Sequence, residues 1–287
     1  MAKGRELKGR IKSVENTRKI TRTMEMVATS KMKRATDRMN SARPYADALR
    51  AVIADLYAPD LAQQFPLLRQ PQRERRAGVL LITSNRGLAG AFNANLIKEA
   101  RALIARLEGA GTSVDVHVVG RKGIGYFKYV GRKLGTQRSD IGDRPSAQHA
   151  AELVDGMMSD FIAGALDAVY VVRSKFKSAL STPPVADRVL PVEPPARGTT
   201  GRDWLLYPSG EKILTELLPA YVRNAVYRAL VETAAAEQAA RRTAMKSATD
   251  NAGEMLNILR RNYNRARQAQ ITQEIAEIVG GAAALQG

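Results

Sequence analysis

The hydrophobic positions of the first 57 residues recur with the alternating spacing of four and three that is typical of a coiled-coil helix. No proline or glycine interrupts the stretch from Ile11 to Arg43. Pro44 follows it and is the only proline before Pro59 that could break the helix. The repeat positions hold Leu7, Ile11, Val14, Arg18, Thr21, Glu25, Ala28, Met32, Ala35, Met39, Ala42, Ala46, Leu49, Ile53 and Leu56. The many alanines and methionines predict a long helix that a partner helix can approach closely.

This repeat becomes polar near its middle, at Arg18, Thr21 and Glu25. The apolar residues of that stretch lie at the neighbouring positions Ile20, Met24 and Val27. Either the coil rewinds locally, or a second partner contacts the helix here. The dense charge of residues 16–27 favours the second partner.

Residues 209–287 carry a second long helical pattern, rich in alanine. Pro219 falls early in it and predicts a break or a kink near Leu217 and Leu218, whereas Gly253 is a weak point that a helix can pass. Two helices at opposite ends of one chain, each longer than a compact core needs, pair most simply with each other. The pattern therefore predicts an antiparallel coiled coil.

Between the two helices, apolar runs typical of buried strands alternate with helical patterns. Strands are expected at 79–83, 114–119 and 168–172, helices at 92–107 and 146–166, and a hairpin or edge strand at 175–192. Four parts are expected: a coiled-coil helix at 1–57, a linker at 58–76, an α/β domain at 77–208 and a coiled-coil helix at 209–287. The expected class is α/β, with a small Rossmann-like domain and a largely parallel sheet inserted between coiled-coil helices.

The charge of the chain is uneven in an informative way. The formal net charge is +17, yet no basic residue follows Arg267. One helical stripe of the last stretch holds Ile271, Ile275, Ile278, Ala282 and Leu285. A basic chain that ends in an apolar, nearly uncharged helix is expected to place that end in a dry environment. The basic remainder suggests an acidic partner: nucleic acid, an anionic membrane surface or acidic protein loops.

Candidate chemistry is sparse. The chain has no cysteine and two histidines, and no apolar run approaches the length of about 18 residues that spans a membrane. The turn at 84–93 lies where phosphate loops lie but lacks their glycine pattern, and residues 120–125 match no phosphate fingerprint either, so tight turns and helix caps are expected at both places. Glu274 and Glu277 have no histidine, cysteine or activated serine near them in sequence, so a polar contact or a solvated face is expected. We predict no catalytic residue, no cofactor and no metal.

Three blocks of sequence carry a family resemblance: IKSVENTRKITRTMEMVA at 11–28, SNRGLAGAFN at 84–93 and YNRARQAQITQEIAEIVGGA at 263–282, with further likeness at 239–251. In these blocks, and over essentially its whole length, the chain resembles the gamma subunit of F-type ATP synthases. The absence of cysteine and of a transit peptide favours the bacterial type. An alternative from the residues alone is a basic coiled-coil protein that binds nucleic acid, and a dinucleotide-dependent oxidoreductase is a more distant one.

The resemblance implies a non-catalytic central rotor shaft, which couples proton-driven rotation of the c-ring to ATP synthesis or hydrolysis at alpha–beta interfaces. The implied partners are three alpha and three beta subunits, epsilon and the c-ring, without nucleic acid. The implied location is peripheral, at the cytoplasmic face of the bacterial plasma membrane, with no segment inserted.

The resemblance also implies roles for particular residues. Rotor–stator contacts fall on Lys19, Met24, Arg241, Gln268, Thr272 and Glu274. The apolar bearing at the tip comprises Ile275, Ile278, Val279, Ala282 and Leu285. The family often has an acidic residue before the proline that precedes the C-terminal helix; here that residue is tyrosine, so the foot contact with the c-ring and epsilon rests on Tyr207 or Glu211.

Overall fold

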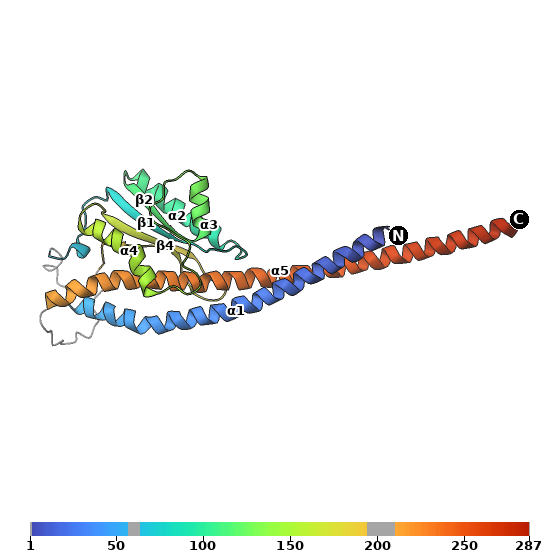
Figure 1. Cartoon of the computed structure of the whole chain (residues 1–287), viewed down its shortest axis with the longest axis horizontal. Helices are drawn as coiled ribbons and strands as arrows, with labels where there is room; N and C mark the ends of the chain where they lie inside the picture. Colours follow the sequence, from blue (N-terminus) through green and yellow to red (C-terminus); the bar gives the residue numbers. More distant parts are fainter. Residues whose placement is uncertain (1, 57–63, 194–209, 287) are drawn as a thin grey trace. The chain divides into compact units, whose positions relative to one another are not determined.

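The chain forms two compact units. A computed structural model describes residues 2–56, 64–193 and 210–286, with side chains between Arg5 and Ala282. The paired-helix unit comprises Met1–Val27 and Arg242–Gly287, and the α/β unit comprises Ala28–Arg241. Helices α1 (Ala2–Leu56) and α5 (Gly210–Gln286) each contribute to both units (Figure 1).

A five-stranded sheet forms the centre of the α/β unit. Its order is β3-β2-β1-β4-β5, and all neighbouring strands run parallel except β5, which is antiparallel to β4 at the edge. The strands are β1 (Arg76–Ile82), β2 (Ser113–Val119), β3 (Gln137–Arg138), β4 (Ala168–Ser174) and β5 (Pro184–Leu190). The expected strands and the largely parallel sheet are therefore confirmed.

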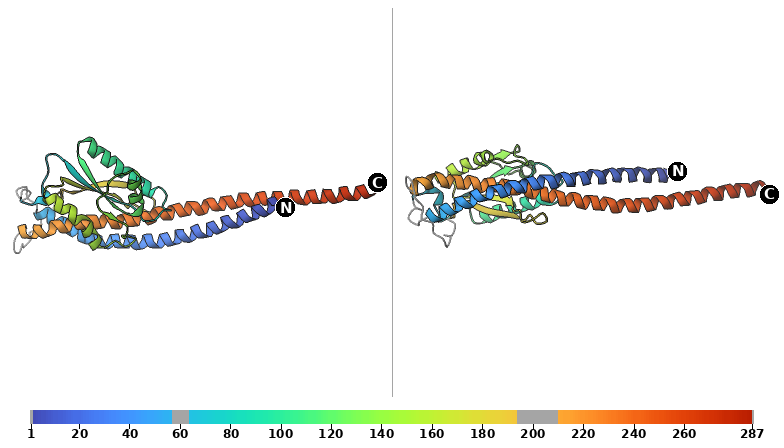
Figure 2. Two further views of the ribbon diagram at one scale, coloured as in Figure 1. Left: turned by 45° about the horizontal axis from the view of Figure 1, so that its top comes forward. Right: turned by 90° about the horizontal axis from the view of Figure 1, so that it is seen from below.

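The side chains of β1 alternate between two apolar layers, as a strand covered on both faces requires. Val79 and Leu81 face α2 (Phe92–Gly109) and α3 (Arg121–Tyr129). Leu80 and Ile82 face α4 (Ala147–Ile162) and the first part of α5. The two layers lie on opposite sides of the sheet (Figure 2).

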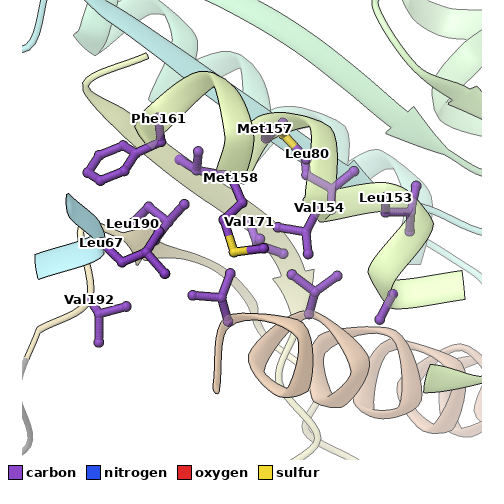
Figure 3. Packing of buried hydrophobic residues seen from close by; sticks show 14 of the residues in the cluster. Leu67, Leu80, Leu153, Val154, Met157, Met158, Phe161, Val171, Leu190 and Val192 are labelled. Carbon is purple, nitrogen blue, oxygen red and sulfur yellow. The ribbon is translucent and has the colours of Figure 1, made fainter. Parts of the chain in front are cut away.

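The larger apolar cluster joins α4, the sheet and α5. Phe161 and Met157 of α4 pack towards Leu80 and Leu190 of the sheet (Figure 3). The end of α1 joins the same cluster through Ile53, which is 1% exposed. A short 3-10 helix, η2 (Pro66–Leu68), closes one side of it. The cluster thus attaches both long helices to the sheet.

Helix α3 was not expected, but the turn and helix cap expected at residues 120–125 are found at Gly120, which is the N-cap of α3. Gly120 does make a turn, with φ of 98°, and a Cβ there would lie 2.2 Å from the Thr83 carbonyl oxygen. The helix then begins at Arg121. Gly123 allows α3 to pack closely, since a Cβ would lie 2.8 Å from Thr83 Oγ1 and 2.8 Å from Val118 Cγ1. The glycines that suggested a turn serve close packing.

Two further expectations about helices are corrected. Helix α4 ends at Ile162 rather than at 166, because Gly164 adopts φ of 77° just beyond it. Helix α5 continues through Pro219, so the break, one of the two expected outcomes, is absent, while the kink stays a prediction. Its neighbours Leu218 and Val222 are 1% and 0% exposed, so packing against the core outweighs the hydrogen bond that proline cannot make. As expected, the helix also passes Gly253.

The predicted fold class is confirmed, and the coiled-coil repeat of α1 can be checked position by position. Of the expected repeat positions only Arg18 is exposed; the others are buried or half-buried. Helix α1 ends at Leu56 and α5 begins at Gly210. The four-part domain division stays a prediction, since the two compact units divide both helices.

Candidate interaction surface of the paired helices

Polar contacts hold the two helices of the paired-helix unit in antiparallel register. The Thr249 hydroxyl lies 2.8 Å from Thr21 Oγ1, and Arg260 Nη2 lies 2.6 Å from Glu15 Oε1. Moving towards the N-terminus of α1 therefore moves towards the C-terminus of α5. Leu256, 2% exposed, supplies apolar contact along the same seam. Thr21 remains in the seam at 9% exposure, so the coil does not rewind at its polar positions.

The second apolar face of α1 consequently stays uncovered. Ile20 is 60% exposed and Val27 is 50% exposed, while Met24 is half-buried. The exposed residue Lys19 borders this face, whereas Arg22, two residues from both Ile20 and Met24, lies on the opposite side of the helix. An uncovered apolar strip beside an exposed cation is typical of a surface that contacts an acidic protein partner.

The last part of α5 is exposed on all sides as far as its side chains are described. Its apolar residues are large and solvent-facing: Ile271 is 48%, Ile275 56%, Ile278 72% and Val279 61% exposed. Ala282 is also exposed, whereas the side chain of Leu285 lies outside the described residues. The tip expected from the sequence is thus an apolar helical surface without cover from the chain itself.

The polar residues next to the tip form hydrogen bonds to other residues of α5. The Thr272 hydroxyl donates to the Gln268 carbonyl oxygen at 3.0 Å. Glu274 accepts from Gln270 Nε2 at 2.8 Å, and Glu277 accepts from Gln273 Nε2 at 2.9 Å. Five of these six residues are exposed, and Gln270 is half-buried. Each carboxylate accepts from a neutral amide one helical turn away, so it keeps oxygen lone pairs that further contacts can use.

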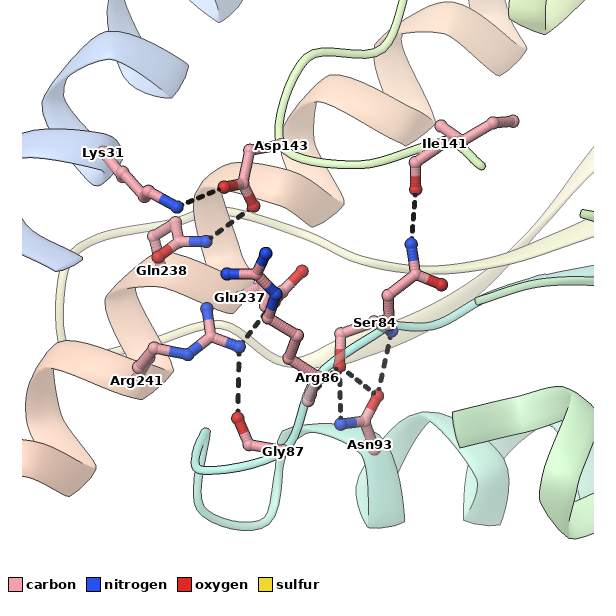
Figure 4. Close-up of polar contacts among 11 residues, drawn as sticks. Lys31, Ser84, Arg86, Gly87, Asn93, Ile141, Asp143, Glu237, Gln238 and Arg241 are labelled. Atoms are coloured by element: carbon pink, nitrogen blue, oxygen red, sulfur yellow. Dashed lines mark hydrogen bonds and ion pairs between the residues drawn. The ribbon is translucent and has the colours of Figure 1, made fainter. Parts of the chain in front are cut away.

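Arg241 lies apart from these residues, in the α/β unit. It is 9% exposed, and its guanidinium donates to Glu237 at 2.6 Å and to the Gly87 carbonyl oxygen at 3.2 Å (Figure 4). Burial raises the pKa of Glu237, and the charge and hydrogen bond of Arg241 oppose that shift. The guanidinium is therefore committed to partners within the chain, and its contact with a stator stays a prediction.

Of the two residues expected at the foot of the shaft, the structure describes only Glu211. Tyr207 lies outside the described residues. Glu211 is exposed in the first turn of α5, where its carbonyl oxygen accepts from the Thr215 hydroxyl at 2.9 Å. A carboxylate at a helix N-terminus is favoured by the helix dipole, and this one is exposed to solvent.

A cavity of about 250 Å³ lies at the carboxyl end of β1, where open α/β sheets often bind ligands. The backbone donors nearby are already used: Arg121 N–H donates to Asn85 Oδ1 at 3.0 Å, and Gly123 N–H donates to Thr83 Oγ1 at 3.0 Å. A phosphate would have to displace these bonds. The described residues include no group of histidines and carboxylates arranged to hold a metal.

Together these features define a class of protein: a mixed α/β protein with long N- and C-terminal helices that expose apolar residues. A family model described as ATP synthase matches residues 3–285. An ATP synthase gamma chain of Gemmatimonas aurantiaca is 64% identical over the full length of both chains. One from Leptospira biflexa is 43% identical over 99% of this chain and all of the relative. The chain belongs to the ATP synthase gamma chain family.

Solved structures show the same fold. A chain of the Euglena gracilis mitochondrial ATP synthase, OSCP/F1/c-ring, rotational state 3, aligns with a TM-score of 0.69 at 19% identity, covering 99% of this chain and 95% of that one. A chain of the Tetrahymena thermophila mitochondrial ATP synthase central stalk and c-ring aligns with a TM-score of 0.63 at 24% identity, covering 80% and 99%. None of these matches supports a nucleic-acid-binding protein. Within the described ranges, no helix has both the length and the apolar character needed to cross a membrane.

Proposed function

We propose that the chain is the central rotor shaft of a proton-translocating F-type ATP synthase and carries no catalytic residue of its own. The observation that carries this proposal is the uncovered apolar end of α5, from Ile271 to Val279. An apolar surface that the chain leaves in water requires another protein to cover it. Membership of the gamma chain family names the complex in which that protein is found.

In this proposal three alpha and three beta subunits surround the paired helices. The tip formed by Ile275, Ile278, Val279, Ala282 and Leu285 turns in an apolar sleeve. Such a contact has no directional hydrogen bonds that must break at each step, so its energy changes little with angle. The apolar character that holds the tip in place therefore also lets it turn.

Polar contacts that pass torque lie next to the tip and on the second face of α1. Gln268, Thr272 and Glu274 contact the stator on α5, together with Arg241, and Met24 does so on α1. Lys19 faces acidic loops of beta subunits. Coulomb attraction across such an exposed gap is modest, about 1 kcal/mol at 4 Å in water, so each contact can form and break within a cycle.

The lack of threefold symmetry in the shaft supplies the coupling. A single two-helix shaft inside a threefold ring presents a different face to each beta subunit at any moment. Turning the shaft exchanges these faces, so three equivalent sites pass in sequence through open, loose and tight states. The same linkage read in reverse lets ATP hydrolysis turn the shaft.

The foot of the shaft contacts the c-ring and epsilon through Tyr207 or Glu211, and the chain is peripheral at the cytoplasmic face of a bacterial plasma membrane. Glu211 supports this part because its carboxylate is exposed. Replacing Glu211 with glutamine in the whole complex tests it: loss of c-ring attachment with normal binding of alpha and beta subunits is expected, and unchanged attachment transfers the role to Tyr207.

Reconstitution with the cognate alpha and beta subunits tests the function as a whole. The expected result is a complex with cooperative ATP hydrolysis that alpha and beta subunits alone do not show. Failure to assemble, or hydrolysis that is independent of this chain, contradicts the proposal. Steeply salt-dependent binding to DNA without associated ATPase activity would favour the nucleic-acid alternative instead.

A further inference from the structure

Asp143, in the loop between β3 and α4, holds both long helices at once. Its Oδ2 accepts from Lys31 Nζ of α1 at 2.6 Å, and its Oδ1 accepts from Gln238 Nε2 of α5 at 3.0 Å (Figure 4). Its backbone carbonyl oxygen accepts from Arg38 Nη1 of α1 at 2.9 Å. One residue thus bonds to two positions on α1 and to one on α5.

A second tie joins α5 to the neighbouring loop, which follows β1. Arg241 donates to the carbonyl oxygen of Gly87 in that loop. The loop is itself braced: Asn85 Nδ2 donates to the Ile141 carbonyl oxygen at 3.0 Å, which connects it to the loop of Asp143. The two loops and the two helices therefore form one connected polar network at the carboxyl end of the sheet.

The apolar packing around this network is made of small side chains. Ala28 and Ala35 of α1 are 1% and 3% exposed, and Ala235, Ala236 and Ala239 of α5 are 0% exposed. Alanine lets two helices approach closely, but its short side chain interlocks little with the neighbouring helix. Such a surface therefore opposes sliding or twisting of one helix against the other only weakly. Hydrogen bonds with fixed directions resist both movements, so the network supplies what the alanine surfaces lack.

The network also lies where the helices leave the α/β unit, whose limits are Ala28 and Arg241. Lys31 is one turn inside the first limit and Arg241 is the second limit. Beyond these residues α1 and α5 continue into the paired-helix unit. Any torque that passes between the α/β unit and the continuing helices must pass through this region.

Asp143 is charged under working conditions. Its burial alone would raise its pKa, but the hydrogen bond and charge of Lys31, helped by the charges of Arg241 and Arg86, leave the pKa below its ordinary value. Lys31 and Asp143 are each more than a third exposed in their side chains. The pair is therefore charged but partly solvated, so Asp143 acts through the directions of its several bonds rather than through one strong pair, and its partners can be substituted.

We infer that Asp143 is a positioning residue, which fixes α1 and α5 against the α/β unit so that rotation of one is passed to the other without slip. This inference rests on the proposed rotor function. It concerns a residue that contacts neither nucleotide nor stator in the proposal, and acts only through the two helices.

The test uses membranes that carry the whole complex, in which ATP hydrolysis and ATP-driven proton pumping are measured together. Asp143→Ala is expected to lower the ratio of pumping to hydrolysis by more than about twofold, because part of each step is lost as twist. Asp155→Asn is the matched control: it weakens the Asp155–Arg223 pair, which also joins the α/β unit to α5, and is expected to leave the ratio unchanged. Equal ratios in wild type and Asp143→Ala overturn the inference.

A second measurement keeps the inference testable if Asp143→Ala assembles poorly. Because the chain has no cysteine, Lys31→Cys and Asp143→Cys introduce its only two thiols. A short thiol-specific cross-linker that can be cleaved by reduction then replaces the ion pair with a covalent link. The cross-linked complex is expected to couple like wild type and the cleaved complex to couple less, in the same sample. No change on cleavage contradicts the inference, whereas a wild-type chain that supports no pumping at all contradicts the proposed function.

Discussion

Large apolar side chains are buried in the α/β unit but exposed at the end of α5. In the sheet, Leu80 and Leu81 are 0% exposed, and the strand that carries them is covered on both faces. At the end of α5, Ile275 and Ile278 are more than half exposed. The first unit completes its own core, while the second region leaves its large apolar side chains exposed. Substitutions in the two regions should therefore report on different properties: folding in one and assembly in the other.

The largest effect is expected from Leu80→Ala, which creates a cavity between the sheet and α4. The free energy of unfolding should fall by about 3 kcal/mol, the middle of the range for buried leucines. Urea denaturation followed by circular dichroism measures it. Leu180→Ala is the matched control, since Leu180 is 86% exposed and its truncation should cost less than about 0.5 kcal/mol. Similar losses in the two variants would contradict the assignment of the core.

Ile275→Asp should weaken assembly while leaving the stability of the free chain almost unchanged. Denaturation of the free chain should change by less than about 0.5 kcal/mol, because the side chain is already in water. Binding to alpha and beta subunits should weaken by more than about tenfold, because a charge would enter an apolar sleeve. Quantitative reconstitution measures the binding. Ile162→Asp, at an isoleucine 47% exposed at the end of α4, should leave assembly intact; equal effects of both would remove the special status of the tip.

Met24→Lys probes the second face of α1 and should have a smaller effect. A new cation would alter contacts with a beta loop without unfolding the paired helices, since Met24 is only half-buried. We expect coupling between hydrolysis and proton pumping to fall by about twofold or more while hydrolysis falls less. Parallel assays on membranes measure both. Met26→Lys, two residues on and therefore on another side of the helix, should spare the coupling; equal losses of hydrolysis and pumping in Met24→Lys would argue against this contact.

The smallest effect concerns Tyr170 of β4 and appears only at alkaline pH. Burial, followed by its hydrogen bond to Glu74 and the charge of Glu74, raises the pKa of Tyr170 from 10.0 to about 12. A folded-state pKa above the unfolded value gives stability that is complete below pH 10 and is lost as the pH rises through about 12. Wild type should therefore lose stability over this window more steeply than Tyr170→Phe in denaturation at stepped pH. Parallel curves for the two proteins would contradict the shift.

The predictable parts of this fold are those that repeat along the sequence. The spacing of four and three gave the seam of α1, and the apolar runs gave β1, β2 and β4, because burial acts on every turn or every second residue. Helix α3 was missed because Gly123 and Gly125 have low helix propensity, and close packing of Gly123 on Thr83 outweighs that cost. Pro219 was misleading for the same reason: core packing on both sides of it keeps α5 continuous.

The functional residues likewise fall into those that a local sequence pattern reveals and those that it does not. The exposed isoleucines of α5 could be predicted, because their helical stripe, with no basic residue after Arg267, is visible in the sequence alone. The network of Asp143 could not, since it joins residues 31, 143 and 238, and no local pattern indicates that a loop carboxylate meets both helices. Arg241 shows the limit of a resemblance: the resemblance implies a stator contact for it, but only the structure shows its guanidinium bound to Glu237 and Gly87.

Because α5 is one uninterrupted helix, the number of residues between two points on it fixes the angle between the faces that they occupy. Each residue of an α-helix turns the chain by about 100° and advances it by about 1.5 Å. Leu256 lies in the seam with α1, and Ile275 and Ile278 lie beyond it on the same helix. One residue inserted between them would leave composition and helicity almost unchanged, yet would turn the isoleucine stripe by more than a quarter of a revolution relative to the seam. The length of this segment therefore sets a phase angle, and insertions and deletions there should be tolerated far less well than substitutions.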